Sequence, residues 1–592
     1  MWLKSPMTSD VDGVLRKGVA AHQAGDLSTP ADAYAFILAV QPNNADALHL
    51  MGLIKAQQGL SEDAVRLIRS AIDVNSGIAL YHANLGRALR GMGDDKAAVQ
   101  ALREAVRLDA NEASYHADLA SALFGAGDAA GARSRALMAL NMVPDFAEAH
   151  LTLGLAYQAL YGPGDEGAVK ELQRAITLKP ELAGAYLGLG IACHETGKSA
   201  EARAYYEQAL QYNPKLVEAE TNLGNLCRDE GRFADAIAHY RAALDIYPGV
   251  PEIWGNLGVA LQESGRLEEA ISTYEHALSI SREDADIRRN RAHALLAAGR
   301  YEEGWHELEW RWRTAHMAPY RKRWRVPEWR GQDPRGKHIL VHAEQGLGDA
   351  IQFCRYIPLL AEKGARVTVE CADPLAPLLA ILPGVVRMIQ PGTSIPSVDA
   401  HVSMMSLPGC FKTDADSIPA DVPYLQVPQK ARRNWTGRTA GWPEGKRIGI
   451  AWRGSAAHAR DVVRSPGLAP FLALAKLPGV VLVSLQKDGG TEELAATPGA
   501  DGIIGTAPML NDFADTAALM SHLDAVVSCD TAPLHLAGAL GVKTVAVLPH
   551  VPEWRWGRGE STCPWYPKMT LVHQPSFGDW DGAFERVVEL LK

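Results

Sequence analysis

The chain has 592 residues, of which 47% are hydrophobic and 22% are charged, and its net charge is −10. This composition is typical of a soluble globular protein with several domains, and it gives no overall attraction to nucleic acid. The seven cysteines form no C-x-x-C pair, the first ten residues lack an apolar run, and no stretch reaches the ~20 apolar residues of a membrane span, so we expect a cytoplasmic protein with reduced cysteines and no membrane span.

Small residues recur every 34 positions through the first half of the chain. One series is Gly18, Gly52, Gly86, Ala120 and Gly154, followed after a two-residue insertion by Gly190, Gly224, Gly258 and Ala292. A second series is Ala64, Ala98, Ala132, Ala168, Ala202, Ala236 and Ala270. The period is that of tetratricopeptide repeats (TPR), which are pairs of antiparallel helices. Only Gly or Ala lets the two backbones of a pair approach closely where they cross.

These series predict a TPR solenoid of about nine repeats over residues 11–315, after a flexible tail over residues 1–10. Pro144, Pro180, Pro214 and Pro248 recur where the second helix of a pair is expected to end. The insertion at 161–165 is predicted to lengthen a surface turn; its role stays open. Because solenoids offer a long groove to polypeptides, we expect a protein partner.

Residues 316–336 have no clean periodicity and are predicted to be a linker or docking segment. A basic run interleaved with aromatic residues leads into it: Trp310, Arg311, Trp312, Arg313, Tyr320, Arg321, Lys322, Arg323, Trp324 and Arg325. We interpret this run as a docking helix whose tryptophans pack on the next domain and whose arginines face solvent. A nucleic-acid patch is the alternative.

Apolar runs alternate with helix-length segments from residue 337 onward. This pattern predicts two Rossmann-like α/β domains with parallel sheets, over 337–442 and 443–592. The predicted strands are 337–342 and 366–371 in the first domain, with a helix over 350–362, and 447–452, 480–485, 525–528 and 544–548 in the second. Two such domains in tandem predict a cleft between them, with ligands bound at the carboxyl ends of the strands.

The first predicted strand is followed by Gly346, Leu347, Gly348 and Asp349. The two glycines let the backbone turn tightly and approach a ligand, and a helix is expected to begin there. Asp349 is a candidate general base or, alternatively, the N-cap of that helix. The segment is not a dinucleotide-binding fingerprint, because Ile351 stands where a third glycine is needed.

Two further polar segments follow predicted strands. Trp452, Gly454 and Ser455, with Arg464 beyond them, suit contacts with a phosphate, although a solvated polar loop is the alternative. Asp530, Thr531 and His535 lie where a strand ends and a small-residue helix begins, and a helix start favours an anion. His535 is either at the ligand or a hydrogen-bonded histidine on a helix face.

The residues from 512 to 567 resemble the catalytic domain of bacterial TPR-containing glycosyltransferases, relatives of the heptosyltransferases with the two-domain GT-B fold. The motif comprises Asp512–Ala518, Leu523-Asp524, Asp530-Thr531, His535–Gly541, Pro549, Glu553–Trp556 and Pro564–Pro567. The resemblance extends over roughly 337–592, and the arrangement is most similar to flagellin glycosyltransferases. It implies an acceptor-side domain over 337–442 and a nucleotide-sugar domain over 443–592.

Carried over by position, the resemblance implies that Asp349 is the catalytic base and that Arg464 lies near the donor phosphates. It implies donor binding by Ser484, Gln486, Lys487, Asp530, Thr531 and His535. From their places after predicted strands, we add five donor-binding candidates: Gly346, Gly348, Trp452, Gly454 and Ser455. One departure is Arg453-Gly454-Ser455, where the relatives often have Ala-Gly-Asn, and it leaves the choice of donor open.

We therefore expect a metal-independent protein O-glycosyltransferase without a cofactor, acting on flagellin held by the TPR groove. Asp414-Ala415-Asp416 is a DxD pattern, but we interpret it as accidental because no strand precedes it. The sugar implied by the flagellin relatives is a CMP-linked nonulosonic acid such as pseudaminic acid, with UDP-N-acetylglucosamine as the alternative. Deleting residues 11–315 should remove acceptor recognition and leave nucleotide binding.

Two other functions stay open. One is a TPR adaptor whose α/β half senses a ligand or is an inactive transferase. The other is a transferase acting on lipopolysaccharide or another cell-surface glycan.

Overall fold

The computed structural model describes residues 11–318, 325–344, 346–454 and 461–592. Its contacts divide the chain into two compact units. Unit 1 is Met1–Asp229 with Asp245–Tyr247, and unit 2 is Glu230–Leu244 with Pro248–Lys592. The last helices of the repeat array therefore belong to the same compact unit as the α/β part. The domain boundaries expected from the sequence stay a prediction.

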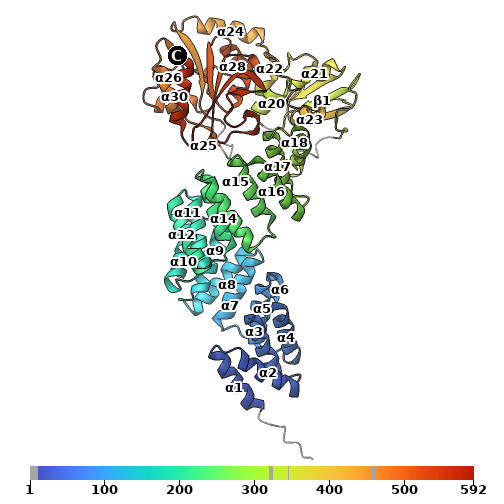
Figure 1. The fold of residues 1–592 in the computed structure, drawn as a ribbon, viewed down its shortest axis with the longest axis vertical. Coiled ribbons are helices and arrows are strands. Elements are labelled where there is room, and N and C mark those ends of the chain that lie inside the picture. Colours follow the sequence, from blue (N-terminus) through green and yellow to red (C-terminus); the bar gives the residue numbers. More distant parts are fainter. Residues whose placement is uncertain (1–10, 319–324, 345, 455–460) are drawn as a thin grey trace, which may run out of the picture. The chain divides into compact units, whose positions relative to one another are not determined.

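Antiparallel helix pairs occupy the first half of the chain, as the 34-residue period predicts (Figure 1). They are α1 (Val11–Gln23), α2 (Ser28–Val40), α3 (Ala45–Gln57), α4 (Ser61–Val74), α5 (Ala79–Gly91), α6 (Asp95–Leu108), α7 (Ala113–Gly125), α8 (Ala129–Met142), α9 (Ala147–Tyr161), α10 (Glu166–Leu178), α11 (Ala183–Glu195), α12 (Ser199–Tyr212), α13 (Val217–Asp229), α14 (Phe233–Ile246), α15 (Pro251–Glu263), α16 (Leu267–Ile280), α17 (Ala285–Ala297) and α18 (Tyr301–Leu308). A 3-10 helix, η1 (Glu309–Arg313), follows α18.

The small residues lie where the two helices of a pair cross, as predicted. A Cβ added to Gly52 would lie 2.7 Å from Cγ1 of Ile68, and one added to Gly258 would lie 2.4 Å from Cε1 of Tyr274. All seven alanines of the second series are fully buried. The prolines stand two residues beyond the ends of α8, α10, α12 and α14, which confirms their predicted place.

The first sheet is parallel throughout, with strand order β3-β2-β1-β4. Its strands are β1 (His338–His342), β2 (Arg366–Glu370), β3 (Val385–Ile389) and β4 (Ala400–Ser403), and its helices are α20 (Leu347–Phe353), α21 (Tyr356–Glu362), α22 (Ala376–Leu379) and α23 (Leu407–Cys410). Both strands predicted here are confirmed, and the helix predicted over 350–362 is divided into α20 and α21.

The second sheet has the order β6-β5-β7-β8-β10-β9 and is parallel except for the pair β9–β10. Its strands are β5 (Lys446–Ala451), β6 (Val480–Ser484), β7 (Ala525–Cys529), β8 (Thr544–Leu548), β9 (Thr562–Cys563) and β10 (Tyr566–His573). Its helices are α24 (Gln429–Thr439), α25 (Asp461–Arg464), α26 (Leu472–Ala475), α27 (Gly490–Ala496), α28 (Phe513–Met520), α29 (Ala532–Leu540) and α30 (Trp580–Leu591), with the 3-10 helix η6 (Trp554–Trp556). The four strands predicted in this half are confirmed.

Helices cover both faces of the second sheet. α26 and α30 lie on one face, where Phe471 and Phe584 pack against Ile448 and Val545, and α28 and α29 lie on the other (Figure 1). In the described part of the chain, no helix has the length and apolar character needed to cross a bilayer.

The cleft expected between the two domains stays a prediction. One hydrophobic core runs through both sheets. It joins Val341 of β1, Leu536 of α29 and Trp305 of α18. α20 packs directly on α29, and a Cβ on Gly348 would lie 2.7 Å from Cδ2 of His535. The glycine thus lets the two α/β halves close on each other at this point.

Candidate active site

The tetrapeptide Glu-Trp-Arg-Trp occurs twice, at 309–312 in η1 and at 553–556 in η6. Each copy buries its arginine against a carboxylate of the loop that follows β1. Arg311 binds Glu344, and Arg555 binds Asp349. Glu344 and Asp349 are therefore each held by an arginine, one from before β1 in the sequence and one from after β8.

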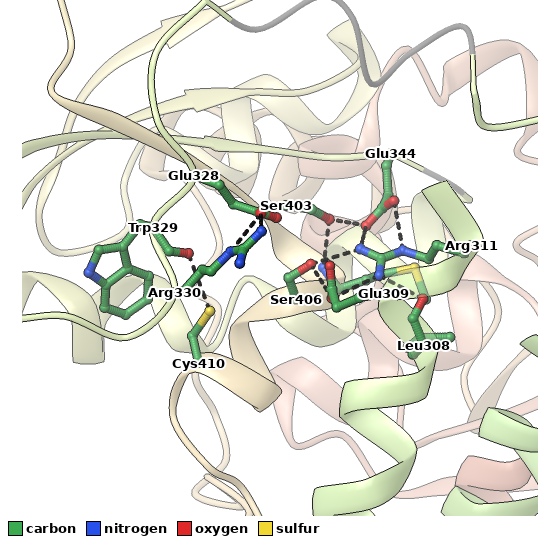
Figure 2. Close-up of polar contacts among 11 residues, drawn as sticks. Leu308, Glu309, Arg311, Glu328, Trp329, Arg330, Glu344, Ser403, Ser406 and Cys410 are labelled. Atoms are coloured by element: carbon green, nitrogen blue, oxygen red, sulfur yellow. Dashed lines mark hydrogen bonds and ion pairs between the residues drawn. The ribbon is translucent and has the colours of Figure 1, made fainter. Parts of the chain in front are cut away.

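Arg311 is the centre of the first contact (Figure 2). Its Nη2 and Nε donate to the two oxygens of Glu344 at 2.7 and 3.0 Å, and its Nη1 donates to Glu309 Oε1 at 2.9 Å. Ser406 accepts from Nη2 at 2.8 Å, while Ser403 donates to Glu344. The Arg311 side chain is only 1% exposed and that of Glu344 3%, so neither charge has water as an alternative partner.

Burial raises the pKa of the Glu344 carboxyl, and the neighbouring Arg311 acts in the opposite direction. The sequence-based expectation that the arginines of this run face solvent is wrong for Arg311. It holds for Arg313, which is exposed and stacks on Trp310 at 4.1 Å. Trp312 is buried 6.0 Å from His342 of β1, which confirms the predicted packing on the next domain. The part of the run from 319 to 324 lies outside the described residues.

Asp349 lies in the first turn of α20, whose N-cap is Gly346, so the alternative role of Asp349 as N-cap is wrong. Its Oδ1 accepts from Nη2 of Arg555 at 2.8 Å. The same Nη2 is 3.8 Å from Glu553 Oε2. The Asp349 side chain keeps 17% exposure, so Asp349 is within reach of small groups while its position is fixed.

Asp530 follows β7 and faces the same cluster of charges. Burial, assisted by Glu553, raises its pKa to about 6, and Arg555 and Arg464 oppose that shift. Thr531 is the N-cap of α29 but forms no capping bond through its side chain. These two residues therefore lie at the strand end and helix start that the sequence predicts.

His535 is buried beside Asp530, with its Nε2 3.8 Å from Asp530 Oδ1. It is 2% exposed, its Nδ1 pairs with the Tyr566 hydroxyl at 2.8 Å, and burial lowers its pKa well below the usual value. Its ring packs on Gly348, as described above. The sequence left two interpretations of His535 open. The structure agrees with the one in which His535 is a hydrogen-bonded histidine on a helix face.

Hydrogen bonds from the backbone and from side chains hold the segment after β5 in place. Gly454 N–H donates to Asp461 Oδ1 at 3.1 Å and to Ser465 Oγ at 3.0 Å, and Arg464 Nε donates to Asp461 at 3.2 Å. A Cβ at Gly454 would lie 2.4 Å from Arg464 Nη2, so the Arg464 side chain lies close against the backbone here. Ser455, a candidate from the sequence, lies outside the described residues.

Four other candidates lie at the edge of the sheet. Trp452 is fully buried in the core, and Gln486 accepts its backbone N–H and that of Arg453, each at 3.3 Å. Ser484 is fully buried and accepts from the backbone N–H of Gln486. Lys487 is exposed and donates to Asn511 O at 2.9 Å. Trp452 and Ser484 thus hold the strand ends in place rather than facing a ligand.

A pocket of about 140 Å³ lies between the repeat helices α15 and α17 and the carboxyl ends of β7 and β8. We name it the α17 pocket. Its lining residues are Val259, Gln262, Glu263, Asn290, His293, Val463, Arg464, Asp530, Pro549, Val551, Pro552, Glu553 and Trp554. It brings Arg464 and Asp530 together, as the sequence predicts, and adds a wall of repeat residues that the sequence did not predict.

Among the residues that the structure describes, no group of three or more His, Cys, Asp or Glu side chains is arranged to hold a metal ion. Asp414 of the DxD pattern instead closes a turn, in which it accepts the backbone N–H groups of Asp416 and Ser417. Metal independence stays a prediction.

Comparison with known families identifies both halves. Residues 49–113, 166–215, 195–251, 228–275 and 263–304 match tetratricopeptide repeat models. Residues 478–577 match the model of glycosyltransferase family 9 (heptosyltransferase). The chain combines tetratricopeptide repeats with a glycosyltransferase family 9 domain. The residues matched by the family 9 model include Asp530, His535 and Arg555.

Similar proteins are known for part of the chain. The chain is 27% identical over 317 residues to protein FlbA of Caulobacter vibrioides, and the match covers 49% of this chain and 52% of FlbA. The chain thus spans about half the length of this curated relative. Solved structures similar to part of the chain include the MamA protein (24% identity, 30% of this chain, 96% of that chain, TM-score 0.27), a thermophilic TPR protein of Thermus thermophilus (24%, 31%, 99%, 0.29) and a TPR protein of Parabacteroides merdae (14%, 42%, 98%, 0.37). All three TM-scores are below 0.5.

Sequence reasoning missed the three buried arginines around the family 9 domain. Arg311 and Arg555 hold the β1 loop, and Arg355 donates to Trp565 O at 2.8 Å and to the Tyr424 hydroxyl at 3.0 Å. The repeated Glu-Trp-Arg-Trp is the signal that could have found two of them. Arg355 lies in an apolar helical stretch, where a charged residue is buried only when it is paired.

Proposed function

We propose that this chain is a protein O-glycosyltransferase, which moves a sugar from a nucleotide-sugar donor to a Ser or Thr hydroxyl of a protein bound by its TPR array. The observation that carries the proposal is the α17 pocket, where repeat helices and strand ends of the α/β part form one wall each. A transferase that acts on a protein needs the acceptor and the donor to meet at one place. Holding the acceptor on the repeats raises its local concentration there.

In the proposed reaction, the acceptor hydroxyl oxygen attacks the anomeric carbon of the sugar. The bond from that carbon to the phosphate oxygen breaks, and the nucleotide leaves with the bonding electrons. The acceptor proton passes to a carboxylate, for which we propose Asp349. Arg464, which lines the α17 pocket, is placed to stabilise the growing negative charge on the phosphate.

The finer assignments are part of the proposal. We take the two sheets as a GT-B pair that acts without a metal, since arginine and the helix start at Thr531 supply positive charge near the leaving group. Flagellin as acceptor and a CMP-linked nonulosonic acid as donor are supported by the resemblance to flagellin glycosyltransferases. UDP-N-acetylglucosamine is the alternative donor.

Intact mass spectrometry of the host's flagellin tests the proposal. Flagellin from cells that lack the gene should lose a repeated sugar-sized mass, which the wild-type gene restores. Asp349→Asn should not restore it, because the base is gone, although its purified protein should bind nucleotide as the wild type does. Unchanged flagellin in the deletion strain would discard that acceptor.

Glu553→Gln is the matched control for the base, because Glu553 contacts the same arginine as Asp349 and lines the pocket. Loss of the sugar mass with Glu553→Gln but not with Asp349→Asn would move the role of base from Asp349 to Glu553.

A further inference from the structure

One wall of the α17 pocket comes from the repeat array. Asn290 and His293 of α17 are three residues apart, so their side chains lie on one face of the helix, and both line the pocket. Gln262 lines it from the end of α15. This wall stands opposite Asp530 and Glu553, which come from the sheet side.

The helices that form this wall are an integral part of unit 2. Ala292 and Leu296 of α17 belong to the core that runs through both sheets. Arg558, which follows η6, donates to Glu263 O at 2.7 Å and so satisfies a carbonyl at the C-terminal end of α15. Glu307 of α18 binds Arg288 and Arg291 of α17 at 2.9 and 3.2 Å. The two wall helices are therefore fixed before any ligand arrives.

The two polar side chains of α17 have hydrogen-bonding capacity to spare. Neither Asn290 nor His293 forms a side-chain hydrogen bond with any other residue that the structure describes, although both are partly buried. Burial lowers the pKa of His293, which leaves the ring neutral at pH 7 with one donor and one acceptor nitrogen. Asn290 likewise offers both donors and an acceptor.

The hydrogen-bonding groups of this wall indicate what kind of ligand group it can bind. A neutral imidazole and an amide suit an uncharged group that carries hydroxyl or peptide N–H and C=O groups. Among the described residues that line the pocket, the positive charge comes from Arg464 on the sheet side, so a phosphate is not expected at the wall of Asn290 and His293. At about 140 Å³, the pocket is also smaller than the ~300 Å³ at which pockets for whole small-molecule ligands begin, so it admits one side chain or one ring.

We propose that Asn290 and His293 bind the acceptor, by contacting the reacting Ser or Thr and the backbone beside it. The proposal rests on the transferase function and gives α15 and α17 a role in it: they end the array that holds the acceptor and present its hydroxyl to the donor. A sugar ring has hydroxyls too, but it would enter from the sheet side with its nucleotide. We therefore assign the wall formed by α15 and α17 to the acceptor.

The test uses the full chain with Asn290→Ala, His293→Ala and His293→Gln, which keeps hydrogen-bonding groups at this position. Asn256→Ala is the matched control, because Asn256 holds the place of Asn290 one repeat earlier and does not line the pocket. Each variant replaces the gene in the host, and intact mass spectrometry measures every protein that carries the sugar mass in wild-type cells and loses it on gene deletion. Calorimetry with UDP and with CMP measures nucleotide binding by the purified variants.

We expect the glycosylated fraction at limiting expression to fall about tenfold or more with Asn290→Ala and His293→Ala, and less with His293→Gln. The nucleotide affinity, the added mass and the melting temperature should stay as in the wild type, and Asn256→Ala should change none of these.

Full glycosylation by both alanine variants would overturn the proposal. So would weakened nucleotide binding, which Arg464→Ala should show, or a different added mass, which would assign the wall to the donor sugar. If no protein loses a sugar mass on gene deletion, the transferase function itself fails, and this inference fails with it.

Discussion

Single residues in this chain take their roles from partners that are distant in sequence. Asp349 is one of several aspartates that precede or begin helices, and its pairing with Arg555, 206 positions away, sets it apart. Glu344 is buried only because Arg311 reaches it from the end of the repeat array. Removing one partner of such a pair leaves an uncompensated buried charge, which costs about 3–5 kcal/mol. The loop with the candidate base therefore depends on both arginines.

Asp530 makes stability depend on pH. Its pKa of about 6 in the folded protein is above the ordinary value of 3.8, so the folded state keeps this proton to higher pH than the unfolded state does. The stabilisation is complete below pH 4 and is lost as the pH rises to about 6. We expect Asp530→Asn to gain about 1–3 kcal/mol of stability relative to the wild type between pH 4.5 and pH 7.

Thermal denaturation of both proteins at the two pH values measures this gain, with the exposed Asp501→Asn as control. Equal pH dependence of Asp530→Asn and the wild type would show that Asp530 is ionised in the folded protein at low pH.

At the scale of elements, each helix pair matches a small residue with a larger one. Gly86 faces Leu102, Gly190 faces Tyr206, and in the one repeat where the partner is Ala136 the small residue is Ala120. The alanine at position 120 is therefore matched by a small residue across its pair. Periodicity shows the series, but only the contacts show why an alanine replaces the glycine in that repeat.

Gly86→Ala should destabilise the array by about 1–3 kcal/mol, because the new Cβ would lie 2.5 Å from Leu102 Cγ. Gly91→Ala, in the same helix α5, is the control: nothing lies within 4 Å of its Cβ, and replacing glycine in a helix should be neutral or slightly stabilising. Urea denaturation followed by circular dichroism measures both. Adding Leu102→Ala to Gly86→Ala recreates the Ala120–Ala136 pairing, so the double variant should lose less stability than the sum of the two single variants. A strictly additive result would contradict this account of the pair.

At the scale of the whole molecule, the compact units do not follow the change from repeats to sheets. Trp305 of α18 donates to Thr413 O at 2.8 Å and packs edge-on against Trp554 and Trp565, with ring centroids 5.4 and 6.3 Å away. Phe577, before α30, packs edge-on against Phe233 of α14. The helices from α14 onward are thus part of the structure that carries the candidate site.

Truncation separates the two possible boundaries. A fragment of residues 230–592 should fold, because it retains unit 2. A fragment of residues 316–592 should be insoluble or melt more than 10 °C lower, since it exposes the surface under Trp305 and leaves Glu344 buried without Arg311. The sequence led to the opposite expectation, namely that nucleotide binding survives deletion of residues 11–315.

Expression yield, melting temperature and UDP or CMP binding of the two fragments check this expectation, with Trp305→Ala in the full chain as a milder test of the same contact. Equal stability of the two fragments would contradict it.

The sequence alone determined the repeat array, the α/β character of the second half, most strands of the sheets and the place of Asp349, Arg464 and Asp530. These features depend on local periodicity and on residues next to strand ends, and both can be read within a few dozen positions. Only the tertiary structure decided that the two sheets close on each other through Gly348 and His535, that Arg311 and Arg555 bind the loop after β1, and that Asn290 and His293 line a pocket with Asp530. The physical reason is that burial of a charge, or its pairing, depends on which distant segments pack together, and no local pattern records that choice.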